Sequence, residues 1–186
     1  LYKDGLQREQ FLPFISIIKN YSIQKELSLK DDYRLKDFNK EQRLYYPLNE
    51  STLFMINKNF RELTRDKKKE IKKINTKGRD FIINNFYDGI LKFKFSDLCD
   101  KNLGAEDYIN ISNISDHIFI EDIPIFNDDN SNQQLRFITL IDILYEKKIN
   151  LSLSLESDLN NLGSSRRHMQ TFKRTISRLI ELTKKT

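Results

Sequence analysis

The sequence predicts an α/β fold of parallel strand–helix units with a small strand-rich insertion. Ile118–Ile120 is a short, continuously apolar run, which is typical of a strand covered on both faces. Leu135–Lys148 has apolar residues around most of a helical circumference, and Ile149–Leu155 has the pattern of a second strand. A last helix over Gln170–Leu182 completes the order strand, helix, strand, helix, which indicates a parallel α/β unit.

The amino-terminal segment is expected to begin with a helix and to continue as a strand. Four apolar residues recur there at helical spacing: Phe11, Phe14, Ile15 and Ile18. Pro13 is compatible with this helix only within its first turn, where no backbone donor is needed. Tyr21–Leu29 alternates between apolar and polar residues and predicts a strand, and Leu44–Pro47 predicts a short extended piece.

A helix and a hairpin are expected in the middle of the chain. Asn49 can cap a helix because its side chain can accept from a free backbone N–H of the first turn. The inward stripe of this helix is predicted to be Leu53, Ile56, Phe60 and Leu63. Lys77–Asp80 has the composition of a turn between two hairpin strands.

A third strand is predicted to begin near Gly89, with apolar alternation at Leu91, Phe93 and Phe95. A helical turn should start at Ser96 or Asp97, and Gly104 should lead into a short helix.

The net charge of +5 is concentrated in one dense basic run, Lys67–Lys73. Such a run forms a solvated turn or helix end, or it contacts nucleic acid or anionic lipid.

Cys99 is the single cysteine, which excludes an internal disulfide and a thiolate metal cluster and suits a reducing compartment. The longest apolar stretches, Phe11–Ile18 and Phe137–Tyr145, are too short to span a bilayer.

A phosphate-binding Walker loop requires the pattern Gly-x-x-x-x-Gly-Lys-Ser/Thr, because its backbone amides must point at the phosphates. The glycines do not have this spacing; they are Gly5, Gly78, Gly89, Gly104 and Gly163. We therefore expect that this chain alone neither binds nor hydrolyses a nucleotide.

Other catalytic centres find little support. His117 and His168 are the only imidazoles, and His117 adjoins an apolar strand, which favours a buried or edge histidine satisfied by a hydrogen bond. Cys99 is expected to be a small core residue. The Gly-x-Ser-x-Gly elbow of serine hydrolases does not occur in the sequence.

Two groups of charged residues are candidates for a binding site. Arg174 and Arg178 are four apart on the last helix, opposite its apolar face, where they can meet phosphates, acidic side chains or water. Glu121 and Asp122 end a buried strand, the position of Walker B acids in nucleotide-binding folds. The alternative is that these carboxylates cap a neighbouring helix where the chain turns.

Four blocks of the sequence, in order, resemble the ZapE cell-division ATPase family, which includes the mitochondrial lactation-elevated (LACE) ATPases. The blocks are distributed over nearly the whole chain: Leu1–Glu9 with Phe11–Ile15 and Asp32–Arg34; Phe95–Cys99 with Leu103–Ala105 and Asp107–Tyr108; Arg136–Asp142 with Leu144–Tyr145; and Phe172 with Arg174–Thr175 and Ser177–Leu179. The pair Glu121–Asp122 departs from the Asp-led pair usual in the family.

The resemblance implies the carboxyl-terminal part of an AAA+-like P-loop ATPase that works as a homo-oligomer. Residues 1–66 would be the end of the ATPase core with the following helical segment, and residues 67–186 a carboxyl-terminal α/β region. The Walker-containing half would lie outside the chain. By position, Arg8 resembles an arginine finger, and Arg174 or Arg178 a sensor or interface arginine. Salt bridges that only hold helices together are the alternative for all three arginines.

The resemblance also implies ATP and Mg²⁺ as cofactors of the full-length protein and a protein as its partner. The partner would be FtsZ or a similar division protein in the bacterial cytoplasm, with a peripheral location at the inner membrane as a variant. In the less favoured version, the protein lies in the mitochondrial matrix and handles inner-membrane proteins. Nucleic acid is not expected as a partner. The rival hypothesis is a non-enzymatic adaptor that binds nucleic acid or a membrane surface through Lys67–Lys73.

Overall fold

The computed structural model describes residues 13–14, 17–18, 20–21 and 42–185. The chain divides into two compact units, residues 1–36 and 37–186. In the first unit, the described residues are helical and exposed, in agreement with the predicted amino-terminal helix. The predicted strand Tyr21–Leu29 lies outside the described residues except for Tyr21, which is helical.

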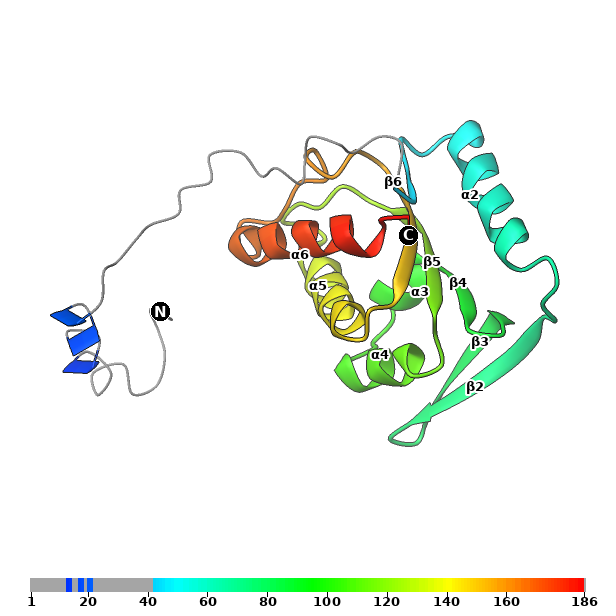
Figure 1. The fold of residues 1–186 in the computed structure, drawn as a ribbon, viewed down its shortest axis with the longest axis horizontal. Helices are drawn as coiled ribbons and strands as arrows, with labels where there is room; N and C mark the ends of the chain where they lie inside the picture. Colours follow the sequence, from blue (N-terminus) through cyan, green and yellow to red (C-terminus); the bar gives the residue numbers. More distant parts are fainter. Residues whose placement is uncertain (1–12, 15–16, 19, 22–41, 186) are drawn as a thin grey trace. The chain divides into compact units, whose positions relative to one another are not determined.

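A six-stranded sheet organises the second unit (Figure 1). Its strands are β1 (Leu44–Tyr45), β2 (Glu70–Thr76), β3 (Arg79–Tyr87), β4 (Ile90–Lys94), β5 (His117–Ile123) and β6 (Asn150–Leu155). The strand order is β1-β6-β5-β4-β3-β2, with parallel pairs from β1 to β4 and antiparallel pairs from β4 to β2. The sheet thus has a parallel half and an antiparallel half, which confirms the predicted fold class.

Helices cover the two faces of the sheet unequally (Figure 1). Four helices lie on one face: α3 (Phe95–Cys99), α4 (Ala105–Ser112), α5 (Ser131–Glu146) and α6 (Met169–Leu182). The other face carries α2 (Glu50–Leu63), and we name it the α2 face.

The large core lies between the sheet and α3–α6. Strand residues such as Leu91, Ile118 and Leu151 are fully buried there. Aromatic rings fill the space next to them, with Phe126 lying 5.5 Å from Phe137 and 5.3 Å from Phe172 between ring centroids. This core accounts for the apolar circumference of α5, since α5 contacts α3, α4 and α6.

The core on the α2 face is smaller and mixed in character. Its buried apolar residues are Ile56, Ile90 and Phe119, with Tyr45, Phe60 and Tyr87 packed around them. Strand alternation places Lys92, Glu121 and Ser152 on this same face. The α2 face therefore combines a few aromatic contacts with buried polar groups.

The local predictions for the middle of the chain are mostly confirmed. Asn49 caps α2, because its side-chain oxygen accepts from Thr52 N at 2.9 Å. Lys77 and Gly78 turn the β2–β3 hairpin with φ of 50° and 79°. Phe95 was predicted as a strand residue, but β4 ends at Lys94 and Phe95 begins α3, where Asp97 accepts from Lys94 N at 3.3 Å.

One prediction for α2 was wrong. Ile56 and Phe60 do face the sheet, but Leu53 and Leu63 are 49% and 40% exposed. The stripe was assigned from spacing alone, which cannot show how much of a helix a sheet covers.

The predicted domain division at residues 66 and 67 stays a prediction. In the described structure one sheet includes elements from both sides of it, β1 before and β2 after.

Candidate functional site

The carboxyl ends of parallel strands are where α/β folds place ligands, so the end of β5 is the first candidate site. Glu121 and Asp122 lie there, as the sequence predicted. Between Ile120 and Ile123 the pairing of β5 with β6 shifts by one residue, which is a β-bulge. Asp122 takes the left-handed conformation (φ 63°), and its N–H donates to Ser154 Oγ at 2.9 Å.

The bulge brings two neighbouring acids to two lysines that lie on one face. Lys92 and Lys94 are two residues apart in β4, so both side chains belong to the α2 face. Lys92 Nζ lies 2.7 Å from Glu121 Oε1, and Lys94 Nζ lies 3.3 Å from Asp122 Oδ2. A regular strand would send adjacent residues to opposite faces, so the bulge is what allows both pairs.

The pair Lys92–Glu121 is buried beneath α2. The side chains are 16% and 9% exposed, and Lys92 Nζ also donates to Asn57 Oδ1 at 2.6 Å. The Lys92 ammonium lies 5.1 Å from the ring centroid of Phe60, within cation–π range. Glu121 Oε1 has no hydrogen-bond partner among the described residues, so its contact with Lys92 is an ion pair rather than a well-directed hydrogen bond.

These contacts limit what the acids can bind. A metal ion needs several free oxygen ligands, and here each acid is neutralised by a lysine. Within residues 42–185 and the described part of the first unit, no group of three or more His, Cys, Asp or Glu side chains could hold a metal. The described residues at the end of β5 therefore do not fit a Mg²⁺–nucleotide site.

Both predicted arginines of the last helix bind the same acid on α5. Arg174 Nη2 lies 2.9 Å from Asp142 Oδ2, and Arg178 Nη1 pairs with Asp142 Oδ1. Arg178 is the more enclosed of the two, with its side chain 19% exposed against 58% for Arg174. The contact of Arg178 with Asp142 joins α6 to α5, while the exposed Arg174 retains access to solvent.

Tyr145 extends this contact along the two helices. The guanidinium carbon of Arg178 lies 4.9 Å from the Tyr145 ring centroid, and the Tyr145 hydroxyl donates to Glu181 Oε2 at 2.9 Å. The sequence did not single out Asp142, Tyr145 or Glu181 as site residues. A signal was present, since Asp142 and Tyr145 are three apart on a helix and Arg174, Arg178 and Glu181 follow one face of the next.

The third predicted arginine, Arg8, lies outside the described residues. Its role as an arginine finger therefore remains a prediction.

The remaining reactive side chains are packed in the interior. Burial, with a smaller contribution from Arg43, lowers the pKa of His117 to about 4, and its Nε2 lies 2.9 Å from Ser152 Oγ. Burial raises the pKa of the Cys99 thiol. Both observations confirm the predicted structural roles, because His117 is buried and has a hydroxyl partner for its ring nitrogen, and Cys99 is a fully buried core residue whose thiol stays protonated at neutral pH.

Acids neutralise much of the basic run. Lys67 pairs with Asp88 at 2.9 Å, Lys72 with Glu70 at 2.9 Å and Lys73 with Asp80 at 2.7 Å. Lys68 and Lys69 lie in the connection between α2 and β2. The hairpin surface is thus less positive than its sequence alone indicates.

The helices on both sides of a partly parallel sheet agree with an AAA+-like P-loop ATPase domain. The sequence model of the AFG1-like ATPase family matches residues 1–186, so the chain belongs to this family. This match confirms the resemblance seen in the sequence. No helix within the described residues is long and apolar enough to cross a membrane.

Curated relatives extend the comparison. The chain is 32% identical over 165 residues to lactation elevated protein 1 homolog B of Danio rerio, which is 87% of this chain and 33% of that protein. It is 28% identical over 182 residues to cell division protein ZapE of Escherichia coli (strain K12), 98% of this chain and 48% of that protein. The chain thus spans a third to a half of the length of these relatives. No solved structure matches it.

Proposed function

We propose that this chain is the carboxyl-terminal portion of an ATP-hydrolysing, protein-remodelling ATPase of the ZapE type. The observation that carries the proposal is the match of the AFG1-like ATPase family to the whole chain. The relatives are two to three times as long, so ATP turnover is proposed for the whole protein and not for the chain alone.

ATP and Mg²⁺ would be held by the remainder of the whole protein. The reason is that the acids at the end of β5 are paired with lysines and the glycines of the chain lack the spacing of a phosphate-binding loop. Within the chain, Arg8 would act as the arginine finger of a homo-oligomer, and Arg174 or Arg178 as a sensor or interface residue.

The partner proposed for the whole protein is a protein client. The name of the ZapE relative refers to cell division, which supports an FtsZ-like division protein as the client in a bacterial cytoplasm, or at the inner membrane as a peripheral protein. The resemblance to the lactation-elevated ATPases, whose name one relative carries, supports the alternative that the whole protein acts from the mitochondrial matrix on inner-membrane clients.

ATP turnover separates the proposed ATPase from the rival adaptor. The complete reading frame and the 186-residue chain should be purified separately, and phosphate release measured with ATP and Mg²⁺. We expect turnover by the complete protein and none by the chain. Turnover by the chain alone would refute the division of labour proposed above. If the complete protein has no turnover but binds DNA in a salt-dependent manner, the basic adaptor becomes the better account.

A further inference from the structure

Exposed apolar side chains gather on α2. Residues 42–185 contain eleven exposed large hydrophobic side chains, and five of them lie between Leu48 and Leu63. Phe54 and Met55, in the middle of the helix, are 62% and 54% exposed. Single exposed apolar residues are ordinary, but a concentration that includes Phe and Met is typical of a protein interaction surface.

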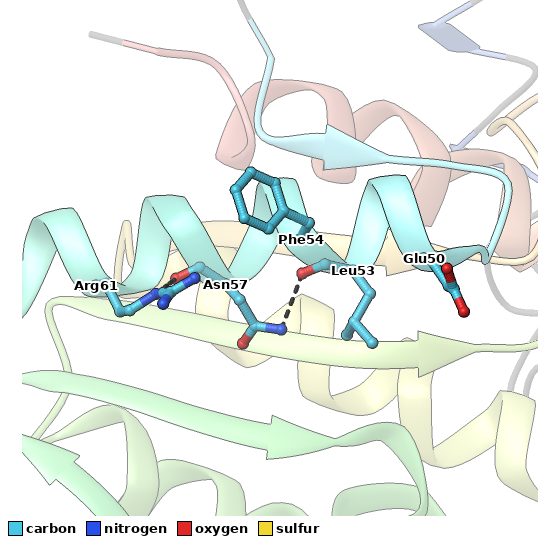
Figure 2. Close-up of a pocket in the computed structure, with 5 residues that line it drawn as sticks. All are labelled: Glu50, Leu53, Phe54, Asn57 and Arg61. Atoms are coloured by element: carbon cyan, nitrogen blue, oxygen red, sulfur yellow. Dashed lines mark hydrogen bonds between the residues drawn. The ribbon is translucent and has the colours of Figure 1, made fainter.

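A hollow of about 500 Å³ follows this part of the helix (Figure 2). Its lining residues recur turn by turn on α2: Glu50, Leu53, Phe54, Asn57 and Arg61. Figure 2 shows Phe54 on one flank of the helix and Leu53 with Asn57 on the other. A second hollow of about 440 Å³ shares Arg61 and continues along Lys58, Glu62 and Arg65. We name the two together the α2 groove.

The two ends of the α2 groove differ in character. Leu53 and Phe54 make the amino-terminal end largely apolar, with Glu50 at its margin. At the carboxyl-terminal end Lys58, Arg61 and Arg65 outnumber Glu62, so this end is basic. Residues 58–69 contain six Lys or Arg and two Asp or Glu. Subtracting these two acids and also Asp88, which is paired with Lys67, leaves a net charge of +3 on this stretch. A complementary partner must be apolar at one end and acidic at the other.

The basic end has free capacity for carboxylates. Arg61 Nε donates to Asn57 O at 3.3 Å, and its two Nη groups have no hydrogen bond or ion pair within the described residues. Glu62 Oε1 lies 3.9 Å from Lys58 Nζ, with both side chains more than 60% exposed, so this pairing is weak. A guanidinium in this state can bind a carboxylate through two parallel hydrogen bonds.

We propose that the α2 groove binds an amphipathic helix of a partner protein, with acidic residues at one end and apolar residues at the other. The acidic turns lie over Arg61 and Arg65, and the apolar turns cover Leu53 and Phe54. An acidic amino terminus suits the dipole of the partner helix, so this helix runs antiparallel to α2. The inference goes beyond ATP turnover and does not depend on it, because binding needs no nucleotide.

The test is a fluorescence anisotropy titration of the 186-residue chain with a labelled, alanine-based 16-residue peptide. The peptide carries Glu in its first two turns and Leu and Phe in its last two turns, on one face. We expect saturable binding that Phe54→Ala and Arg61→Glu each weaken by roughly tenfold or more. Met169→Ala and Arg167→Glu are matched controls at other exposed positions and should leave binding within about twofold of the original chain. A peptide with Lys in place of Glu should bind roughly tenfold more weakly or not at all.

Three results would overturn this proposal. The first is a failure of the predicted peptide binding: either the folded chain does not bind the acidic peptide, or the Arg61→Glu variant binds it as tightly as the original chain. Another is tighter binding of a single-stranded oligonucleotide that displaces the peptide, which would assign the groove to nucleic acid. The third is self-association in sedimentation that Phe54→Ala abolishes, which would assign it to a second copy of the chain.

Discussion

Lys92 and Glu121 form an ion pair beneath α2, with Lys92 Nζ 2.7 Å from Glu121 Oε1. The pair sits next to the small aromatic core that holds α2 on the sheet, and Lys92 connects to that helix through Asn57. Because Glu121 is on a bulge, its position depends on the irregular pairing of β5 with β6. The attachment of α2 therefore depends on the local geometry of β5.

Removing one member of this pair should destabilise the chain strongly. Lys92→Met leaves the carboxylate of Glu121 buried without its counter-ion, and we expect a loss of about 3 kcal/mol in the free energy of unfolding. The double variant Lys92→Met, Glu121→Leu should recover part of this loss, because no buried charge remains. Urea denaturation measures the free energy of unfolding of the single and the double variant. A single variant as stable as the original chain would show that water reaches the pair.

The ion pair between α5 and α6 can be tested by a double-mutant cycle. Arg178→Ala should cost about 1–2 kcal/mol, because Arg178 is largely enclosed and also stacks on Tyr145. Arg174→Ala should cost less than about 0.5 kcal/mol, because this side chain is mostly exposed. Urea unfolding of both variants in the Asp142 and Asp142→Ala backgrounds gives each coupling energy. Equal couplings for the two arginines would contradict their different burial.

The same variants address the predicted sensor role in the complete protein. If Arg174 contacts nucleotide, Arg174→Ala should lower ATP turnover while leaving the unfolding free energy nearly unchanged. If it only supports α6, turnover should stay near that of the unaltered protein. Stability and turnover together therefore distinguish the two roles that the sequence left open for this arginine.

His117 should make the chain less stable in mild acid. Burial lowers its folded-state pKa to about 4 from the ordinary 6.5, so the unfolded chain binds more protons between these values. Its contribution is fully present above pH 6.5 and is lost as pH falls to 4. The loss amounts to about 3 kcal/mol at most. Urea unfolding at pH values from 7 to 4 measures how steeply the free energy of unfolding depends on pH. His117→Gln keeps a polar group near Ser152 and should make this dependence weaker. An unchanged pH dependence in the variant would assign the effect to carboxylates.

The sequence predicted the strand–helix order well wherever periodicity alone decides the structure. The helices α5 and α6 and the strand β6 were located to within a few residues, because each combines an apolar pattern with a polar boundary. The Asn49 cap and the Lys77–Asp80 turn were predicted from residue types whose preference for caps and turns depends only on their immediate neighbours. These features need no knowledge of the rest of the fold.

Features that depend on the pairing of distant strands were not predictable. The bulge brings Asp122 to the same face as Glu121, and neither Lys92 nor Asn57 was expected beside these acids. The exposure of Leu53 depends on how far the sheet extends under α2, which its own sequence cannot show. In both cases the deciding contacts are made with elements distant in the sequence, as in the hydrogen bond from Asp122 N–H to Ser154 Oγ.

Two glycines in turns offer a matched test of close packing. Gly78 and Gly89 both have positive φ, of 79° and 81°, so an alanine is strained at either position. An added Cβ at Gly78 meets open space, whereas at Gly89 it would overlap the Asp116 side chain. Gly78→Ala should cost about 1 kcal/mol, and Gly89→Ala at least about 1 kcal/mol more. Thermal unfolding measures the difference. Equal losses would mean that Asp116 moves aside freely.

Arg8 provides the sharpest test of the proposed oligomeric mechanism. In the complete protein, a guanidinium offered across a subunit interface acts on charge that develops only in the transition state, so binding of ATP should not need it. We expect Arg8→Ala to lower turnover by roughly a thousandfold while the affinity for ATP stays within a few-fold. Arg167→Ala, at an exposed position of the second unit, is the control and should have full turnover. Normal turnover of the Arg8 variant would exclude this residue from the reaction, whereas a parallel loss of ATP binding would indicate a structural role.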